Sequence, residues 1–250
     1  MFIKRSFIVV FGLLSMTVSS LNAQQTEVVP SSLPAPEIDA TAWVLMEMNS
    51  GAVVTGHNAE LPLPPASITK LMMNYVVFER LRDGDVALSD QVPISEKAWR
   101  AEGSRMFADV NTRIELAHLL KSTIIQSGND AAIALAEYTG GTERAFAQLM
   151  NQAAAKLDLT HSHFENSTGL PAEGHAMSAH DIAKLAAAII REYPEFYSWY
   201  AEKEYTHNNI TQRNRNRLLW KDDSVDGLKT GHTEAAGFCL VASAQRGSER

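Results

Sequence analysis

Three short motifs carry residue types that together suit a serine acyl-transfer reaction. Ser67 stands three positions before Lys70, and two further motifs follow in order, Ser127–Asn129 and Lys229–Gly231. A serine hydroxyl is a weak nucleophile and needs an adjacent base. A lysine amine is that base only where burial or a nearby positive charge lowers its pKa. The residue types therefore suggest Ser67 as the nucleophile, Lys70 as its base and Lys229 as the nearby charge.

Ser67 and Lys70 are expected at the start of a helix. Pro64 and Pro65 precede the serine, and residues 71–78 form a mostly apolar run without Gly or Pro. This pattern predicts a helix that begins near Pro65. Residues three apart lie on one helix face, so the amine can reach the hydroxyl. The unpaired N–H groups of the first turn can also stabilise a developing oxyanion.

The second motif is expected on a tight loop. Ser127–Asn129 lies between two helical patterns, and Gly128 permits the bend. On such a loop Ser127 can relay a proton to a leaving amine, and Asn129 can hold a substrate carbonyl or amide. Taken alone, the triplet is more typical of a helix cap.

The third motif is expected on a strand. Lys229 and Thr230 directly follow Val225–Leu228. Lys229 can neutralise a substrate carboxylate, Thr230 can donate a hydrogen bond to it, and Gly231 leaves the strand edge open to a ligand. Taken alone, Lys229 is more typical of a solvated surface charge.

The elements that must position these motifs indicate an α+β layer fold. Residues 42–48 and 52–56 predict a β-hairpin, and helical patterns dominate from about residue 95 to residue 200. The clearest helical patterns cover residues 114–126, 130–138, 142–157 and 179–191. Strands return near 204–206 and over 225–233 and 237–244. One antiparallel sheet flanked by helices is therefore expected from both ends of the chain, with an all-helical insertion.

The N-terminus has the pattern of a secretory signal peptide. A basic start precedes an apolar run too short to span a membrane, and the small residue Ala23 precedes polar positions. We expect a signal peptide over residues 1–23, a linker over 24–37 and a folded domain over 38–250. Removal of residues 1–23 changes the formal net charge from −7 to −9, which disfavours binding to nucleic acid.

The composition does not favour a disulfide or a metal centre. Cys239 is the only cysteine, so no intramolecular disulfide is expected. Four histidines gather in one region without a recognised ligand spacing, namely His161, His163, His175 and His180. A serine mechanism requires no ion, so these histidines are expected to be solvated or hydrogen-bonded. No cofactor and no metal are predicted.

The three motifs together match the S-x-x-K, serine-triplet and K-T-G signature of penicillin-recognising enzymes. From about Ile38 to Gln245 the chain resembles the low-molecular-mass penicillin-binding proteins that are serine-type D-alanyl-D-alanine carboxypeptidases. Further matching stretches are Asn166–Leu170, Asn214–Asn216, Leu218–Trp220 and Val225–Gly227. The resemblance implies that residues 38–250 form the catalytic domain.

The resemblance also implies roles for individual residues. The implied catalytic residues are Ser67, Lys70 and Ser127. The implied substrate-binding residues are Asn129, Arg215, Lys229, Thr230, Gly231 and His232. The backbone N–H groups of Ser67 and His232 would form the oxyanion hole. The implied partners are peptidoglycan stem peptides that end in D-Ala-D-Ala, and β-lactams as covalent inhibitors.

Two other functions remain open from the sequence. A serine β-lactamase shares these motifs, but class A enzymes deacylate with a glutamate, and no matching E-x-x-L-N segment lies between Ser127 and Lys229. Those enzymes also carry aspartate where this chain has Gly128. A non-catalytic penicillin-binding or cell-wall-binding domain would have the same groups without turnover. Whether the substrate is precursor or nascent wall is also open.

The resemblance carries an expectation about the C-terminus. In the family at least one more core strand and a helix follow the position of Arg250. That strand lies between the hairpin near Val44 and the strand near Leu240, so the catalytic domain is expected to be truncated. Family members often carry a C-terminal membrane anchor absent from this sequence. We therefore expect an exported, periplasmic protein whose membrane association depends on such an anchor.

Overall fold

The computed structural model of the protein describes residues 35–250. The expected signal peptide over residues 1–23 and most of the linker over 24–37 lie outside the described residues. Within the described range, no helix combines the length and the apolar character needed to cross a bilayer.

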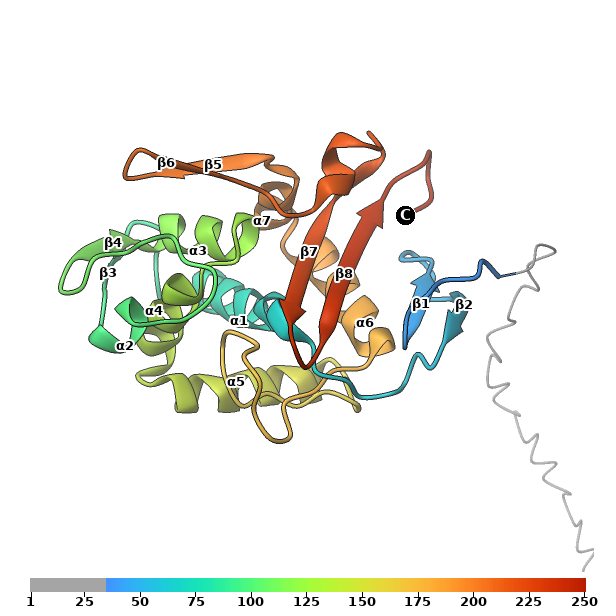
Figure 1. Cartoon of the computed structure of the whole chain (residues 1–250), viewed down its shortest axis with the longest axis horizontal. Coiled ribbons are helices and arrows are strands. Elements are labelled where there is room, and N and C mark those ends of the chain that lie inside the picture. The colour runs from blue at the N-terminus through green and yellow to red at the C-terminus, as the bar shows by residue number, and fades with distance from the viewer. Residues whose placement is uncertain (1–34) are drawn as a thin grey trace, which may run out of the picture.

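Helix α1 (Thr69–Asp83) is the central element of the molecule (Figure 1). Its first ten residues, 69–78, are all buried. A helix that is apolar on most of its faces is stable only inside a core. The 3-10 turn η1 (Ala66–Ile68) precedes it, so the helical start expected near Pro65 is confirmed.

The other helices surround α1. The longer ones are α3 (Leu116–Ile125), α4 (Asn129–Gly140), α5 (Glu143–Lys156) and α6 (Ala179–Glu192). The short ones are α2 (Glu96–Trp99), α7 (Pro194–Tyr197), η2 (Ser198–Ala201) and η3 (Arg217–Trp220). The side chains of Thr142 and Ser178 accept hydrogen bonds from the first turns of α5 and α6. Both side chains therefore act as N-caps.

The strands form antiparallel pairs. The predicted hairpin is β1 (Trp43–Met46) with β2 (Val53–His57), and the predicted C-terminal pair is β7 (Val225–Thr233) with β8 (Gly237–Ala244). Two small pairs complete the list: β3 (Gln91–Pro93) with β4 (Arg113–Glu115), and β5 (Glu204–His207) with β6 (Ile210–Arg213). The sequence patterns predicted β5 but missed β3, β4 and β6, which are only three or four residues long.

The single continuous sheet expected from the sequence is divided within residues 35–250. Backbone pairing joins β1 only to β2, and β7 only to β8. Both hairpins contact α6, and Figure 1 shows them apart. Two hydrogen bonds link them, from the Met48 N–H to the Arg250 carbonyl at 2.7 Å and from Asn49 Nδ2 to the Ser248 carbonyl at 3.1 Å. Residues 245–250 fold into a turn beside β8, so packing on α6 and these contacts replace a strand ladder.

An aromatic cluster fills the core behind α1. Phe78 is fully buried, and its ring stacks on Phe196 with centroids 4.6 Å apart. Tyr193 packs against Phe78 and meets Tyr75 edge-on. These contacts join α1 to the segment that follows α6, so the helix carrying Lys70 is held by the largest side chains of the core.

Candidate active site

Ser67 and Lys70 meet at the start of α1, as their spacing predicts. Ser67 lies in the turn η1, and its Oγ is 3.1 Å from the Nζ of Lys70. The same Nζ lies 2.7 Å from Asn129 Oδ1 and 2.7 Å from the carbonyl oxygen of Thr168. The amine of Lys70 therefore has three oxygen neighbours, from three separate segments of the chain.

These contacts determine how a neutral Lys70 would be oriented. The Thr168 carbonyl and Asn129 Oδ1 can only accept hydrogen bonds. A neutral amine has two N–H groups, which these two oxygens would occupy. Its lone pair is then left for the Ser67 hydroxyl, whose proton it can accept. The geometry thus matches a base paired with a nucleophile.

The surroundings of Lys70 favour this neutral form. Lys70 is fully buried. Burial lowers its pKa well below the usual value, and the positive charges of Lys229 and Arg215 lower the pKa further. The sequence suggested Lys229 as a charge that acts on Lys70, and the structure brings the two close enough for that effect.

Ser127 has a hydroxyl group that is available inside the site. The residue is 2% exposed and has a φ of +68°, in the left-handed region. Its Oγ is buried without a hydrogen-bond partner among the described residues. An unpaired buried hydroxyl is costly, which is consistent with a group reserved for a ligand.

Gly128 is required by the packing of its loop. A Cβ at this position would lie 2.4 Å from Ser122 Oγ and 2.9 Å from Asp130 Oδ1. The buried Asp130 carboxylate itself accepts hydrogen bonds from the N–H groups of Met106 and Ala108. The loop therefore has no space for the aspartate found at this place in class A β-lactamases.

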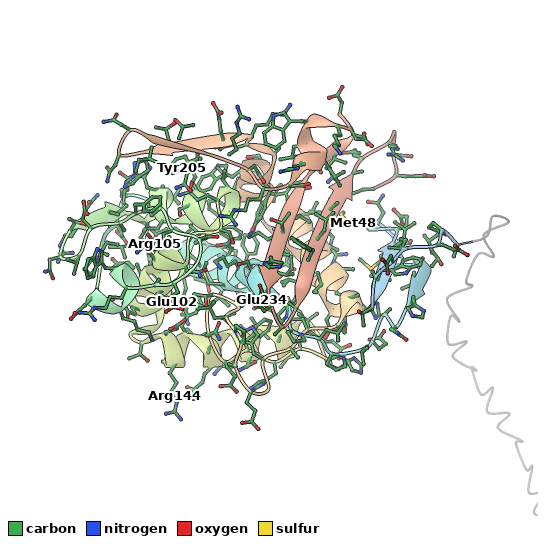
Figure 2. All side chains as sticks on the ribbon, viewed as in Figure 1. Met48, Glu102, Arg105, Arg144, Tyr205 and Glu234 are labelled. Atoms are coloured by element: carbon green, nitrogen blue, oxygen red, sulfur yellow. The ribbon has the colours of Figure 1, made fainter. Side chains whose placement is uncertain are left out.

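Asn129 is bonded differently from the sequence expectation. Its Oδ1 accepts the hydrogen bond from Lys70, and its Nδ2 donates to the Glu102 carbonyl at 2.6 Å. The side chain thus orients Lys70 and joins α4 to the loop around Glu102, with one N–H left for a substrate. Figure 2 shows Glu102 on the side of α1 where α2 and α4 lie, and Glu234 at the turn between β7 and β8.

Lys229 is a buried residue and not a surface charge. It is 2% exposed, and its Nζ donates to the Thr230 carbonyl at 2.9 Å. Burial and the charge of Arg215 lower its pKa to about 7. A carboxylate arriving beside it would favour the protonated amine.

Gly231 brings strand β7 against the start of the catalytic helix. A Cβ at this position would lie 2.9 Å from the backbone nitrogen of Ser67 and 3.1 Å from the Cβ of Ala66. The glycine therefore serves the contact between β7 and η1, in addition to the open strand edge expected from the sequence. The exposed His232 follows, and its ring packs on Phe238 with centroids 4.4 Å apart.

Two buried asparagines, Asn214 and Asn216, fix the backbone on either side of Arg215. Asn214 Nδ2 donates to the carbonyls of Tyr200 and Glu202, and Asn216 Nδ2 donates to the Gly227 carbonyl. Arg215 between them is exposed. Its charge still lowers the pKa of Lys70 and Lys229, so all three cations share one region.

The segment from Glu165 to His175 completes the site, and the sequence motifs did not identify its contacts. Gly169 has a φ of +84°, and a Cβ there would lie only 1.8 Å from the Ala66 carbonyl oxygen. The Glu165 N–H donates to Nδ1 of the buried His175, whose Nε2 lies 2.8 Å from Thr69 Oγ1. His175 is therefore the neutral tautomer that donates to Thr69, and burial lowers its pKa to about 4.

Glu143 holds the same segment from the helical side. Its Oε1 accepts hydrogen bonds from the N–H and Oγ of Ser167, and its Oε2 pairs with Lys97 at 2.7 Å. The position of the Thr168 carbonyl thus depends on groups far away in the sequence. A backbone carbonyl leaves no signal in a motif, which is why the sequence reading missed it.

The arrangement places a serine hydroxyl beside a buried lysine amine and an adjacent cationic strand, which are the groups that a serine acyl-transfer protein requires. The family profile described as D-alanyl-D-alanine carboxypeptidase matches residues 28–250. The chain therefore belongs to the D-alanyl-D-alanine carboxypeptidase family.

Individual relatives support this membership. The chain is 44% identical over 254 residues to the D-alanyl-D-alanine carboxypeptidase DacD of Escherichia coli, covering 99% of this chain and 65% of the relative. It is 45% identical over 226 residues to DacC of Escherichia coli, covering 88% of this chain and 56% of that relative. The chain thus spans less than two thirds of these curated relatives.

Solved structures show the same fold. Penicillin-binding protein 5 from Haemophilus influenzae matches with a TM-score of 0.84 at 43% identity, over 86% of this chain and 64% of that one. Penicillin-binding protein 6B from Escherichia coli matches with a TM-score of 0.83 at 44% identity, over 88% of this chain and 72% of that one. The expected α+β fold of the DD-peptidase type is confirmed.

Proposed function

We propose that the protein is a serine D-alanyl-D-alanine carboxypeptidase that removes the terminal D-alanine from peptidoglycan stem pentapeptides. The observation that carries this proposal is the fully buried Lys70 amine, 3.1 Å from the Ser67 hydroxyl and lowered in pKa. Membership of the carboxypeptidase family supports the substrate class.

Acylation begins at the Ser67 hydroxyl. Its oxygen attacks the carbonyl carbon between the two D-alanines while its proton passes to the neutral Lys70 amine. The oxyanion of the tetrahedral intermediate is stabilised by the backbone N–H groups of Ser67 and His232. The C–N bond then breaks, and the leaving nitrogen takes the proton from Lys70 through Ser127, whose Oγ has no other partner in the described chain. Lys70 is thereby neutral again. D-Alanine leaves, and the remaining peptide is an ester of Ser67.

Deacylation reverses these proton transfers with water. Water attacks the ester carbonyl and gives a proton to Lys70, and the ester C–O bond breaks. The Ser67 oxygen takes that proton back, and the shortened peptide leaves as a free acid. A β-lactam would acylate Ser67 through its ring amide and be lost slowly, which makes it a covalent inhibitor.

The terminal carboxylate of the substrate is bound by the cationic strand. Lys229 and Arg215 supply positive charge, and Thr230 donates a hydrogen bond. A groove of about 360 Å³ lies beside this site, lined in part by Pro65, Leu170 and Thr233. It offers space for the part of the stem peptide that precedes the scissile bond.

The place of action follows from the substrate. We propose that residues 1–23 direct export, that residues 24–37 are a linker, and that residues 38–250 belong to the catalytic domain of a periplasmic enzyme. The partners are stem peptides and β-lactams, and the acidic net charge of −7 disfavours nucleic acid.

Ser67→Ala tests the proposal directly. We expect release of D-alanine from a D-Ala-D-Ala peptide to fall at least about a thousandfold, because no other group replaces the nucleophile. Covalent labelling by a fluorescent penicillin should disappear. Ser89→Ala is the matched control, since Ser89 is exposed and distant in sequence from the three motifs.

Three results would contradict the proposal. Labelling that persists in Ser67→Ala would remove Ser67 as the nucleophile. Intact labelling without D-alanine release would instead indicate a penicillin-binding domain without turnover, and fast hydrolysis of the β-lactam would indicate a lactamase.

A further inference from the structure

Two histidines and two carboxylates from three separate segments meet outside the serine site. Glu60 lies on the loop between β2 and η1, His161 on the loop between α5 and α6, and His180 and Asp181 in the first turn of α6. One ligating atom from each of Glu60, His161 and Asp181 lies within 4.8 Å of the other two. None of these residues has a role in the proposed reaction.

The Glu60 carboxylate connects the two imidazoles. Its Oε2 is 3.2 Å from His161 Nδ1, and its Oε1 is 2.5 Å from His180 Nδ1. In a tetrahedral zinc site with bonds of about 2.0–2.2 Å, the donor atoms lie about 3.3–3.6 Å apart. Small side-chain rotations would therefore bring this cluster to bonding distances.

Asp181 is the buried member of the cluster. It is 1% exposed, and its Oδ2 accepts hydrogen bonds from the N–H and Oγ groups of the loop carrying His161, both at 2.8 Å. It forms no salt bridge with a lysine or arginine of the described chain. Buried carboxylates are usually paired with a cation or bound to a metal. The start of α6 compensates part of this charge, and the free Oδ1 can serve as a ligand.

The backbone holds the three segments together without an ion. The His180 N–H donates to the Ala59 carbonyl at 2.9 Å. Leu63 and Met177 form an isolated antiparallel bridge. The site is thus supported by contacts beyond its own ligands, which reduces the entropy lost on binding an ion.

We propose that Glu60, His161 and Asp181 bind one divalent transition-metal ion of the zinc type, while His180 contacts the second oxygen of Glu60. Imidazole nitrogen together with carboxylate oxygen suits such ions, whereas magnesium prefers oxygen ligands alone. The bound ion takes no part in the acyl transfer. It ties the loop that leads into Ser67 to α6 and to the loop after α5, and so stabilises the folded protein by mass action.

The test measures zinc binding to the metal-free chain, prepared without a polyhistidine tag. Isothermal titration with ZnCl₂ should show one site, and zinc should raise the melting temperature. His161→Ala and Glu60→Gln, both at exposed positions, should each weaken binding at least about tenfold. MgCl₂ should give no comparable binding.

His163→Ala is the matched control. His163 lies two residues from His161 and pairs only with Glu165, at 2.9 Å. Its removal should leave zinc affinity unchanged. Equal zinc affinity in wild type and both cluster variants, whose metal-free melting temperatures confirm folding, would overturn the proposal. Magnesium binding as tight as zinc, or no saturable zinc binding, would also overturn it.

Discussion

At the scale of single residues, the two site lysines are controlled by the same physical effect. Lys70 and Lys229 are both buried, and burial is the largest cause of their lowered pKa values. The proposed reaction uses them in opposite states. Lys70 must be neutral to accept a proton, whereas Lys229 must be charged to bind a carboxylate.

Substrate binding should therefore weaken as pH rises through about 7, the pKa of Lys229. Below this pH the amine is protonated, and above it the protonated fraction falls by up to about tenfold per pH unit. We expect the KM for a free-acid D-Ala-D-Ala peptide to rise between pH 7 and 9 by steady-state kinetics. An amidated peptide should show no such rise.

Lys229→Arg provides the control for this pH dependence. A guanidinium stays charged over this range, so the KM of the variant should be flat with pH even if its absolute value changes. Identical pH profiles for the free-acid and amidated peptides would contradict the role given to Lys229.

At the scale of elements, the segment around Gly169 packs against the start of α1 and bonds to its side chains. It presents the Thr168 carbonyl to Lys70, packs Gly169 against Ala66, and bonds His175 to Thr69. The Lys70 amine is thus oriented by a loop 98 residues away in the sequence.

Gly169→Ala should disrupt this contact. The added Cβ would overlap the Ala66 carbonyl oxygen, so loop and helix start must separate and the hydrogen bond between Thr168 and Lys70 should break. We expect a loss of about 3 kcal/mol or more in urea unfolding, consistent with strong overpacking. Acylation by penicillin should slow at least about tenfold.

Gly174→Ala separates the packing effect from backbone strain. Gly174 has a φ of +81°, close to that of Gly169, but a Cβ there would meet nothing nearer than 3.9 Å. It should cost about 1–2 kcal/mol from strain alone. Equal losses in the two variants would show that the contact with Ala66 is not important.

At the scale of the whole molecule, the site depends on the core behind it. The buried face of α1 packs through Phe78 on Tyr193 and Phe196. The hairpins β1–β2 and β7–β8 are joined by packing on α6 and by the hydrogen bonds of Met48 and Asn49 to residues 248–250. The Arg250 guanidinium also pairs with Asp226 at 2.6 Å. Stability should therefore reside mainly in the helical core.

Phe78→Ala should lower the free energy of unfolding by about 3–5 kcal/mol, because it leaves a cavity among the aromatic rings. Urea denaturation measures this loss. Phe238→Ala is the control, since Phe238 is 92% exposed and its change should stay within about 0.5 kcal/mol. A similar loss in both variants would contradict a core centred on Phe78.

The sequence by itself determined the features that depend on short-range interactions, namely the Ser67–Lys70 spacing at a helix start and the hairpin over residues 42–56. Neighbouring residues settle these features through local hydrogen bonding and helix periodicity. The sequence does not show that the Asn129 amide also bonds Lys70 and the Glu102 carbonyl.

The lowered pKa values of the site lysines and the cluster around Glu60 arise only from the tertiary structure. The pKa of a lysine depends on how completely the folded chain removes water from it, and on charges brought near from distant segments. The Thr168 carbonyl lies 98 residues from Lys70, and His180 lies 120 residues from Glu60. Such contacts exist only after the chain has folded, so no spacing of motifs records them.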